Sequence, residues 1–257
     1  MQPMPITFMA LLLAYLLGDF PLQPGWIIRN KGKNLWPLIC HGITHYILAW
    51  TCLLIFAQIP YLSIYGQTTI IGYLFVHLMA GRIKQMLIAR KVLPDNWMTF
   101  LFDQSLQVIV LAAAAVILTG SSVTELIHIT QLSMTTKTHL LEAGIIYVAV
   151  IFGGGYLIRY LTRSLAKATV AEGPAQLQNA GLYVGWIERF LIITAIAIQS
   201  PALVGLILTG KSIARFPEFK EARFAEYFLI GTLLSISLSV VGGIVLLQLL
   251  YGAVSLK

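Results

Sequence analysis

The sequence predicts an all-α protein, a polytopic bundle of about eight membrane-spanning helices with both termini on the non-cytoplasmic side. Three observations predict this fold class. Of the 257 residues, 58% are hydrophobic and only 11% are charged, whereas a soluble domain carries about 25% charged residues. The apolar residues form segments close to the roughly 20 residues that a hydrocarbon core requires. The basic residues gather toward the ends of these segments, which is typical of membrane proteins.

Eight apolar segments define the predicted spans. They cover about 4–20, 35–57, 68–88, 99–119, 140–161, 182–199, 201–215 and 227–251. The first lacks a basic flank before it and a small-residue cleavage site after it, so it is expected to be a retained span. The sixth and seventh are joined only by Gln199, Ser200 and Pro201, so a re-entrant hairpin is the alternative to two short spans. A four-span half over 1–119 and another over 140–257 make one membrane domain.

The distribution of basic residues predicts the orientation. With eight spans, all but two of the 17 Lys and Arg residues fall on one side, and the exceptions are Lys137 and Lys257. Cytoplasmic loops carry the excess of basic residues, so the crowded side is cytoplasmic. No sustained basic stripe is present, so no nucleic acid partner is expected. Membrane lipids are the expected contacts, and a second copy or another membrane protein is open as a partner.

Two histidines in the second segment are the most informative feature. His41 and His45 are four residues apart, which places both imidazoles on one helix face. Ionisable groups inside a span usually face a bundle interior, a partner or a water-filled cavity. At 1.5 Å per residue they lie about 9 and 15 Å from the cytoplasmic end of the segment. This spacing suits a pair of metal ligands.

Three further polar residues are predicted at matching depth. His77 lies in the third segment, Asp103 in the fourth, and Asp19 closes the first. Three histidines with carboxylates form a ligand set for a divalent metal such as Zn²⁺, with the two aspartates as candidate catalytic groups, and the same set would suit a proton relay. Hydrogen bonds to these ligands are expected from Gln23, Gln104 and Gln107.

Structural roles stand beside these functional ones. A single histidine in a span is more often hydrogen-bonded to a neighbouring helix than bound to metal. Asp19 and Asp103 lie near the interface, where either could pair with Lys31 or Lys84. Residues His128 and His139 fall in an outer connection and are expected to be solvated.

A second polar group occupies the C-terminal half. It comprises Glu188, Arg189, Lys211, Arg215 and Glu226. Opposite charges here can pair across helices and reduce the free energy of their desolvation, so ion pairing is favoured over substrate binding. The small residues Gly153–Gly155 and Gly242–Gly243 are expected to permit close helix approach.

These motifs, in this order, resemble a bacterial inner-membrane family known as domain-of-unknown-function family 3307. The matching stretches are GDFPLQP, HGITH, HLMAGRIK, FLFDQSLQ, GKSIARFPE and FAEYFLIGTLLS. The resemblance extends over nearly the whole chain. The resemblance implies a multi-pass protein of the inner membrane and no settled activity. The family pattern has an aspartate where this chain has Gly81 and a histidine where it has Gln107, so two candidate ligands are missing here.

Three functions follow as alternatives. The first is a membrane-embedded metal-dependent hydrolase of a lipid or amphiphile, a comparison that rests on the histidine pair. The second is a transporter or channel that uses the same cluster as a proton or ion relay, which the short sixth and seventh spans favour. The third is a non-catalytic membrane partner protein. Residues alone do not decide whether the chain is an enzyme.

Overall fold

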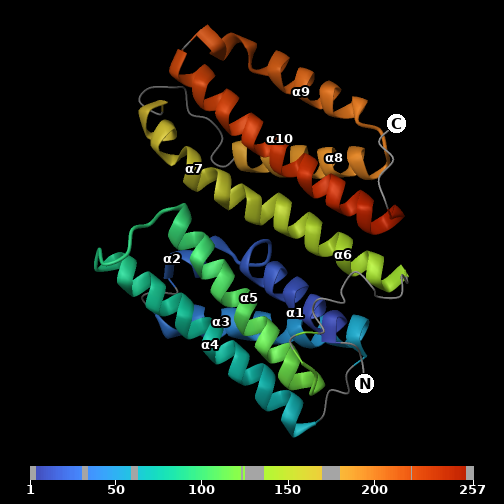
Figure 1. The fold of residues 1–257 in the computed structure, drawn as a ribbon. Helices are drawn as coiled ribbons and strands as arrows, with labels where there is room; N and C mark the ends of the chain where they lie inside the picture. Colours follow the sequence, from blue (N-terminus) through green and yellow to red (C-terminus); the bar gives the residue numbers. More distant parts are fainter. Residues whose placement is uncertain are drawn as a thin grey trace. The chain divides into compact units, whose positions relative to one another are not determined.

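The computed structural model consists of helices joined by turns and loops, and it describes residues 4–30, 34–58, 63–122, 124, 136–169, 180–220 and 222–252. No strand occurs in these ranges. The helices are α1 (Met4–Asp19), α2 (Gly25–Asn30), α3 (Leu35–Cys52), α4 (Ile64–Ala89), α5 (Trp97–Thr119), α6 (Thr136–Val148), α7 (Gly154–Thr169), α8 (Ala180–Ala197), α9 (Ala202–Ala214) and α10 (Ala222–Tyr251) (Figure 1). Two π-helical turns, η1 (Leu53–Ala57) and η3 (Ala149–Gly153), continue α3 and join α6 to α7, and a 3₁₀ turn, η4 (Phe216–Lys220), follows α9.

Each of the eight predicted apolar segments falls on a helix of the structure. Among the described residues, four helices are long and apolar enough to cross a membrane. They are Leu35–Ala57, Trp97–Thr119, Thr136–Arg163 and Phe224–Tyr251. The helices Met4–Asp19 and Ala202–Ala214 are apolar but shorter. The all-helical membrane class is therefore supported by four candidate spans.

The chain divides into two compact units, residues 1–145 and 146–257. In the first unit α1 packs against α3, η1 and α5, while α4 packs against α3 and α5 (Figure 1). Twelve of the 16 residues of α1 are buried. A helix that is apolar on every side is stable only when it is surrounded by protein or lipid. Its composition therefore explains why this short helix forms the centre of the unit.

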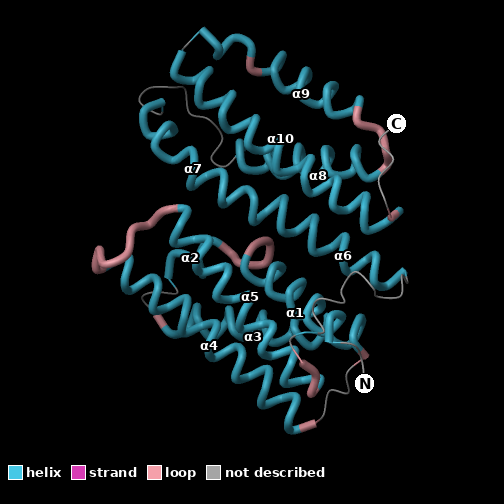
Figure 2. The backbone as a smooth tube through the Cα atoms, viewed as in Figure 1, coloured by secondary structure: helices cyan, strands magenta, loops and turns pink. Residues whose placement is uncertain are grey.

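Side-chain caps set the start of the two helices that flank the site. Ser63 accepts a hydrogen bond from the Gly66 amide at the start of α4, and Asn96 accepts one from Thr99 at the start of α5. Such caps satisfy amide groups that have no partner within the helix. The loop between α4 and α5 is short (Figure 2), so the two helices run antiparallel and bring residues from the end of α4 beside residues from the start of α5.

The second unit is built on close packing of α7, α8 and α10. A Cβ added at Gly154 would overlap the side chain of Leu238, and one at Gly242 would lie 2.7 Å from Val150. These helices can approach so closely only because the glycines have no side chain. The role predicted for small residues at these places is confirmed for Gly154 and Gly242.

Candidate metal centre

Four side chains of the first unit converge on one point. They are Asp19, His41, His45 and His77, and each offers one ligand atom within 4.8 Å of the others. Among the described residues, this is the one group of His, Cys, Asp and Glu with such spacing. These residues were predicted to lie at similar depths in their apolar segments, so that they could meet. The structure brings all four together.

Three elements hold the four residues. Asp19 is the last residue of α1, the two histidines of α3 lie one turn apart on its buried face, and His77 lies on the buried face of α4. The exposed fractions of His41, His45 and His77 are 3%, 1% and 4%, while the Asp19 side chain is 15% exposed. The carboxylate is therefore the side of the group nearest to solvent.

Distances between the ligand atoms match a tetrahedral metal better than direct hydrogen bonds. The Nε2 atoms of His41, His45 and His77 lie 3.2, 3.4 and 3.6 Å from Oδ1 of Asp19. Hydrogen bonds from a charged nitrogen to a carboxylate are shorter, at about 2.7–2.9 Å. Zn–N bonds of about 2.0–2.1 Å place two ligands of a tetrahedral zinc about 3.3 Å apart. The donor set and its spacing therefore fit Zn²⁺.

A hydrogen bond from outside the group orients His77. Its Nδ1 lies 3.0 Å from Oε1 of Gln107, and a carbonyl oxygen can only accept, so Nδ1 carries the proton. Nε2 then presents its lone pair toward Asp19 and His41, whose own Nε2 is 3.5 Å away. Metal-bound histidines commonly have such a partner on the other ring nitrogen. Gln107 is 2% exposed and contacts the ring nitrogen of His77 that is not directed at Asp19.

The other two predicted glutamines also lie near the group. The side-chain nitrogen of Gln23 is 3.3 Å from Nε2 of His41. Gln104 accepts a 2.8 Å hydrogen bond from the hydroxyl of Tyr15, whose ring packs edge-on to His77 with centroids 5.7 Å apart. Gln104 therefore acts through Tyr15, a residue that sequence reasoning did not identify.

Gly18 is a second residue that sequence reasoning missed. A Cβ built on Gly18 would lie 2.6 Å from both Cε1 and Nε2 of His45. The edge of the imidazole that carries the ligand nitrogen therefore lies directly against the backbone of α1. A glycine just before an acid at the end of an apolar helix was the available signal, because glycine disfavours a helix interior.

Asp103 has a different environment from Asp19. Its Oδ2 forms an ion pair with Nζ of Lys84, and it is not a member of the four-residue group. The sequence analysis considered this pairing with Lys84 as the structural alternative to a functional role for Asp103. Asp103 is 8% exposed, so Lys84 supplies the opposite charge that a buried carboxylate needs.

The two positions at which the resemblance implies other residues, Gly81 and Gln107, lie outside the four-residue group. Gln107 contacts the far nitrogen of His77 and not the centre of the group. Gly81 lies one turn beyond His77, and a Cβ added there would meet nothing within 4 Å.

The polar group of the second unit includes one cross-helix ion pair. Lys211 on α9 lies 2.7 Å from Oε2 of Glu188 on α8, as the opposite charges predicted. Arg189 is 4% exposed and donates from Nε to the carbonyl of Ile151 in η3, at 2.9 Å. Its Nη1 lies 3.3 Å from Oγ of Ser235. This group connects helices.

The remaining predicted polar residues have these positions. Glu226 is exposed, and Arg215 is half-buried after the end of α9. His139 Nδ1 faces Glu142 Oε2 at 4.0 Å in α6. His128 lies outside the described residues.

Fold and site together define a helical membrane protein with a buried group of three histidines and one aspartate. Comparison with protein families then identifies the chain: the profile of DUF3307, described as a protein of unknown function, matches residues 7–151. The chain belongs to this family. The matched segment contains all four converging residues and Gln107. Searches of curated proteins and of solved structures found no match.

Proposed function

We propose that this protein is a metal-dependent hydrolase embedded in the bacterial inner membrane, acting on a lipid or another amphiphile. The observation that carries the proposal is the set of four ligand atoms, spaced 3.2–3.6 Å from Asp19 and buried in a unit with apolar helices. His41, His45 and His77 hold the metal. Asp19 is the fourth group and the one that solvent reaches.

The proposed topology has eight spans with both termini on the non-cytoplasmic side. The four long apolar helices support part of it, and α1, α4, α8 and α9 coincide with the other four apolar segments. In this topology the histidine group lies in the cytoplasmic half of the membrane. A substrate that reaches a site at this depth has to be soluble in the membrane or its interface, which favours an amphiphile.

The chemistry assigns a role to each side chain. A divalent metal held by the three histidines would lower the pKa of a bound water to about 7 and so would supply a nucleophile at neutral pH. Asp19, whose Oδ1 lies 3.2–3.6 Å from the three Nε2 atoms and which is the most exposed of the four residues, would accept the proton of that water. Gln107 keeps the His77 lone pair on the inner side of the ring. Asp103 is ion-paired with Lys84 and is the second candidate for a proton acceptor.

Metal analysis of the purified protein is the first test. We expect about one equivalent of zinc per chain, and less than a tenth of an equivalent when both His41 and His45 are replaced by alanine. His139→Ala is the matched control, because this histidine is outside the group and should leave the metal content unchanged. Equal and negligible zinc in all three proteins would refute the proposal.

Activity is tested separately on metal-loaded protein in detergent or vesicles. Release of product from ester or phosphoester amphiphiles should require the metal and fall at least a hundredfold in Asp19→Asn, as for the loss of a general base. Hydrolysis that survives the loss of the metal and of Asp19 would place the reaction elsewhere.

Ion or proton passage is the second candidate, and the number of protein ligands favours it. Catalytic zinc sites usually have three protein ligands and an open position, whereas four protein ligands close a tetrahedron. X-ray absorption of the zinc-loaded protein distinguishes the two. Three protein ligands with a water support hydrolysis. Four protein ligands, together with a pH-dependent ion flux in proteoliposomes that His45→Ala abolishes, support passage.

A further inference from the structure

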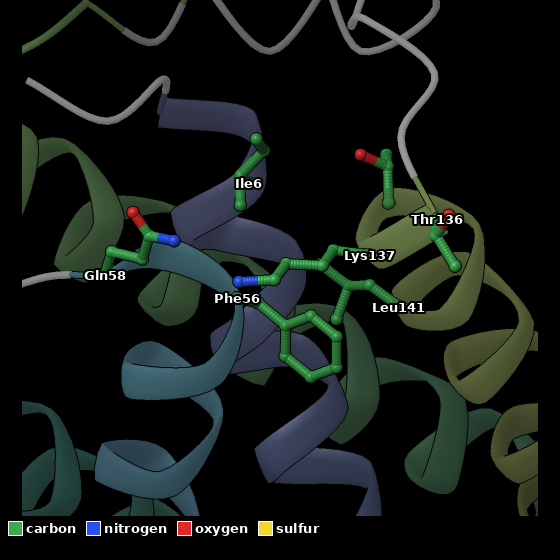
Figure 3. Close-up of a pocket in the computed structure, with 7 residues that line it drawn as sticks. Ile6, Phe56, Gln58, Thr136, Lys137 and Leu141 are labelled. Carbon is green, nitrogen blue, oxygen red and sulfur yellow. The ribbon is translucent and has the colours of Figure 1, made fainter.

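A cavity lies at the end of the first unit opposite the histidine group. It has a volume of about 480 Å³ and is lined by Ile6, Phe56, Gln58, Thr136, Lys137, Thr138 and Leu141 (Figure 3). Its wall begins at Ile6, near the start of α1, whereas Asp19 is at the other end, about 20 Å away along the helix. Because of this distance, the cavity is separate from the candidate metal centre. Its volume lies within the range of about 300–1,000 Å³ that is typical of small-molecule sites.

The lining is divided by chemistry. Ile6, Phe56 and Leu141 form an apolar part, while hydroxyl, amide and ammonium groups come from Thr136, Thr138, Gln58 and Lys137. In Figure 3 the side chain of Lys137 extends across the cavity, with its ammonium group near Phe56 and on the same side as the Gln58 amide. An apolar surface beside convergent polar groups matches a ligand that has both an apolar and a polar part.

The charge of the lining favours an anion. Lys137 makes no hydrogen bond or ion pair with the part of the chain that the structure describes, and no carboxylate is among the described residues that line the cavity. Glu142, the acid one turn away, is 5% exposed and faces His139 at 4.0 Å instead. The first turn of α6 adds amide groups that have no partner within the helix. Both contributions attract negative charge.

The local backbone directs the Gln58 amide to this place. α3 ends in the π-helical turn η1, and Gln58 follows it with a φ of 50°, in the left-handed region. Single π-helical turns are rare and often occur at functional sites. The turn therefore ends the helix so that the side chain of Gln58 faces the start of α6.

We propose that this cavity binds the head group of an anionic phospholipid, with the phosphate at Lys137 and the first part of the acyl chains against Ile6, Phe56 and Leu141. In the proposed topology the cavity lies at the outer surface of the membrane, at the level of the lipid head groups. A lipid reaches it without leaving the bilayer. This inference does not depend on metal binding or hydrolysis.

Native mass spectrometry of the full chain in detergent tests the proposal, with phosphatidylglycerol, phosphatidylcholine and glycerol 1-phosphate as separate probes. The wild type should bind phosphatidylglycerol more tightly than phosphatidylcholine. Lys137→Gln should weaken phosphatidylglycerol binding about tenfold, as for a lost hydrogen bond to a charged group. Lys91→Gln is the matched control, because Lys91 is also exposed and lies in the turn after α4, away from the cavity.

A second variant guards against a folding effect of the first. Thr136→Trp fills the cavity from its exposed rim and should reduce phosphatidylglycerol binding to the level of phosphatidylcholine. Equal binding of phosphatidylglycerol by the wild type, Lys137→Gln and Thr136→Trp would overturn the proposal. If glycerol 1-phosphate binds as tightly as phosphatidylglycerol, the proposal that the cavity recognises a membrane lipid is wrong.

Discussion

Replacing Gly18 by alanine should remove metal binding from an otherwise folded protein. The added Cβ would lie 2.6 Å from Nε2 of His45, whereas carbon atoms in contact are about 3.5–4.0 Å apart. The imidazole must therefore move by roughly 1 Å. Metal–ligand distances tolerate about 0.2 Å, so His45 would no longer reach a metal held by the other three residues.

The free energies can be estimated from this displacement. Overpacking of this kind typically costs about 1–3 kcal/mol of folding stability. Loss of the His45 bond should weaken zinc binding by at least the 10–100-fold seen when the partners of a ligand are removed. A hundredfold corresponds to about 2.7 kcal/mol. The effect on the metal should thus be large even if the fold tolerates the methyl group.

Competition with a chromogenic chelator measures the zinc affinity of the solubilised protein, and thermal unfolding with and without zinc measures its stability. Gly72→Ala is the matched control, because a Cβ at this helical glycine would meet nothing within 4 Å. Helix propensity should then make it neutral or slightly stabilising. Unchanged zinc affinity in Gly18→Ala would refute the geometric argument and the ligand role of His45 with it.

Three other variants test separate contacts. Gln107→Leu removes the acceptor for Nδ1 of His77 and should weaken zinc binding about 10–100-fold, as measured by the same competition. Tyr15→Phe removes the hydrogen bond to Gln104 and should lower the free energy of unfolding by about 1 kcal/mol while the zinc content stays unchanged. Gly154→Ala inserts a methyl group between tightly packed helices of the second unit and should lower the free energy of unfolding by about 1–3 kcal/mol. The zinc affinity should stay unchanged.

Most of the helical architecture could be predicted from the sequence, because apolar length determines where a membrane helix can form. The predicted segment 35–57 ends at the same residue as η1, and 99–119 ends at the same residue as α5. The π-helical turns were not predicted. A π-turn differs from an α-turn by one extra residue per hydrogen-bonded ring, and neither composition nor periodicity over one turn records that difference.

The sequence predicted how deep each site residue lies along its helix, but not the direction in which its side chain points around the helix axis. The distance of a residue from the end of its segment follows from 1.5 Å per residue, and it predicted that His41, His45 and His77 could meet. The direction in which a side chain points around its helix depends on how the helices pack. The contact between Gly18 and His45 depends on the same packing, so it could not be derived from either helix alone.

Asp19 and Asp103 show how the direction of a side chain around its helix affects its possible function. Both were predicted near the cytoplasmic end of a span, and the sequence offered each the same roles. Packing turns Asp103 toward Lys84 and Asp19 toward the three histidines. A carboxylate neutralised by a lysine needs no metal, whereas a carboxylate surrounded by imidazole nitrogens adds the negative charge that makes the group a strong ligand for a divalent cation. The ion pair with Lys84 therefore distinguishes Asp103 from Asp19, and Asp19 is the acid on which the metal-centre hypothesis depends.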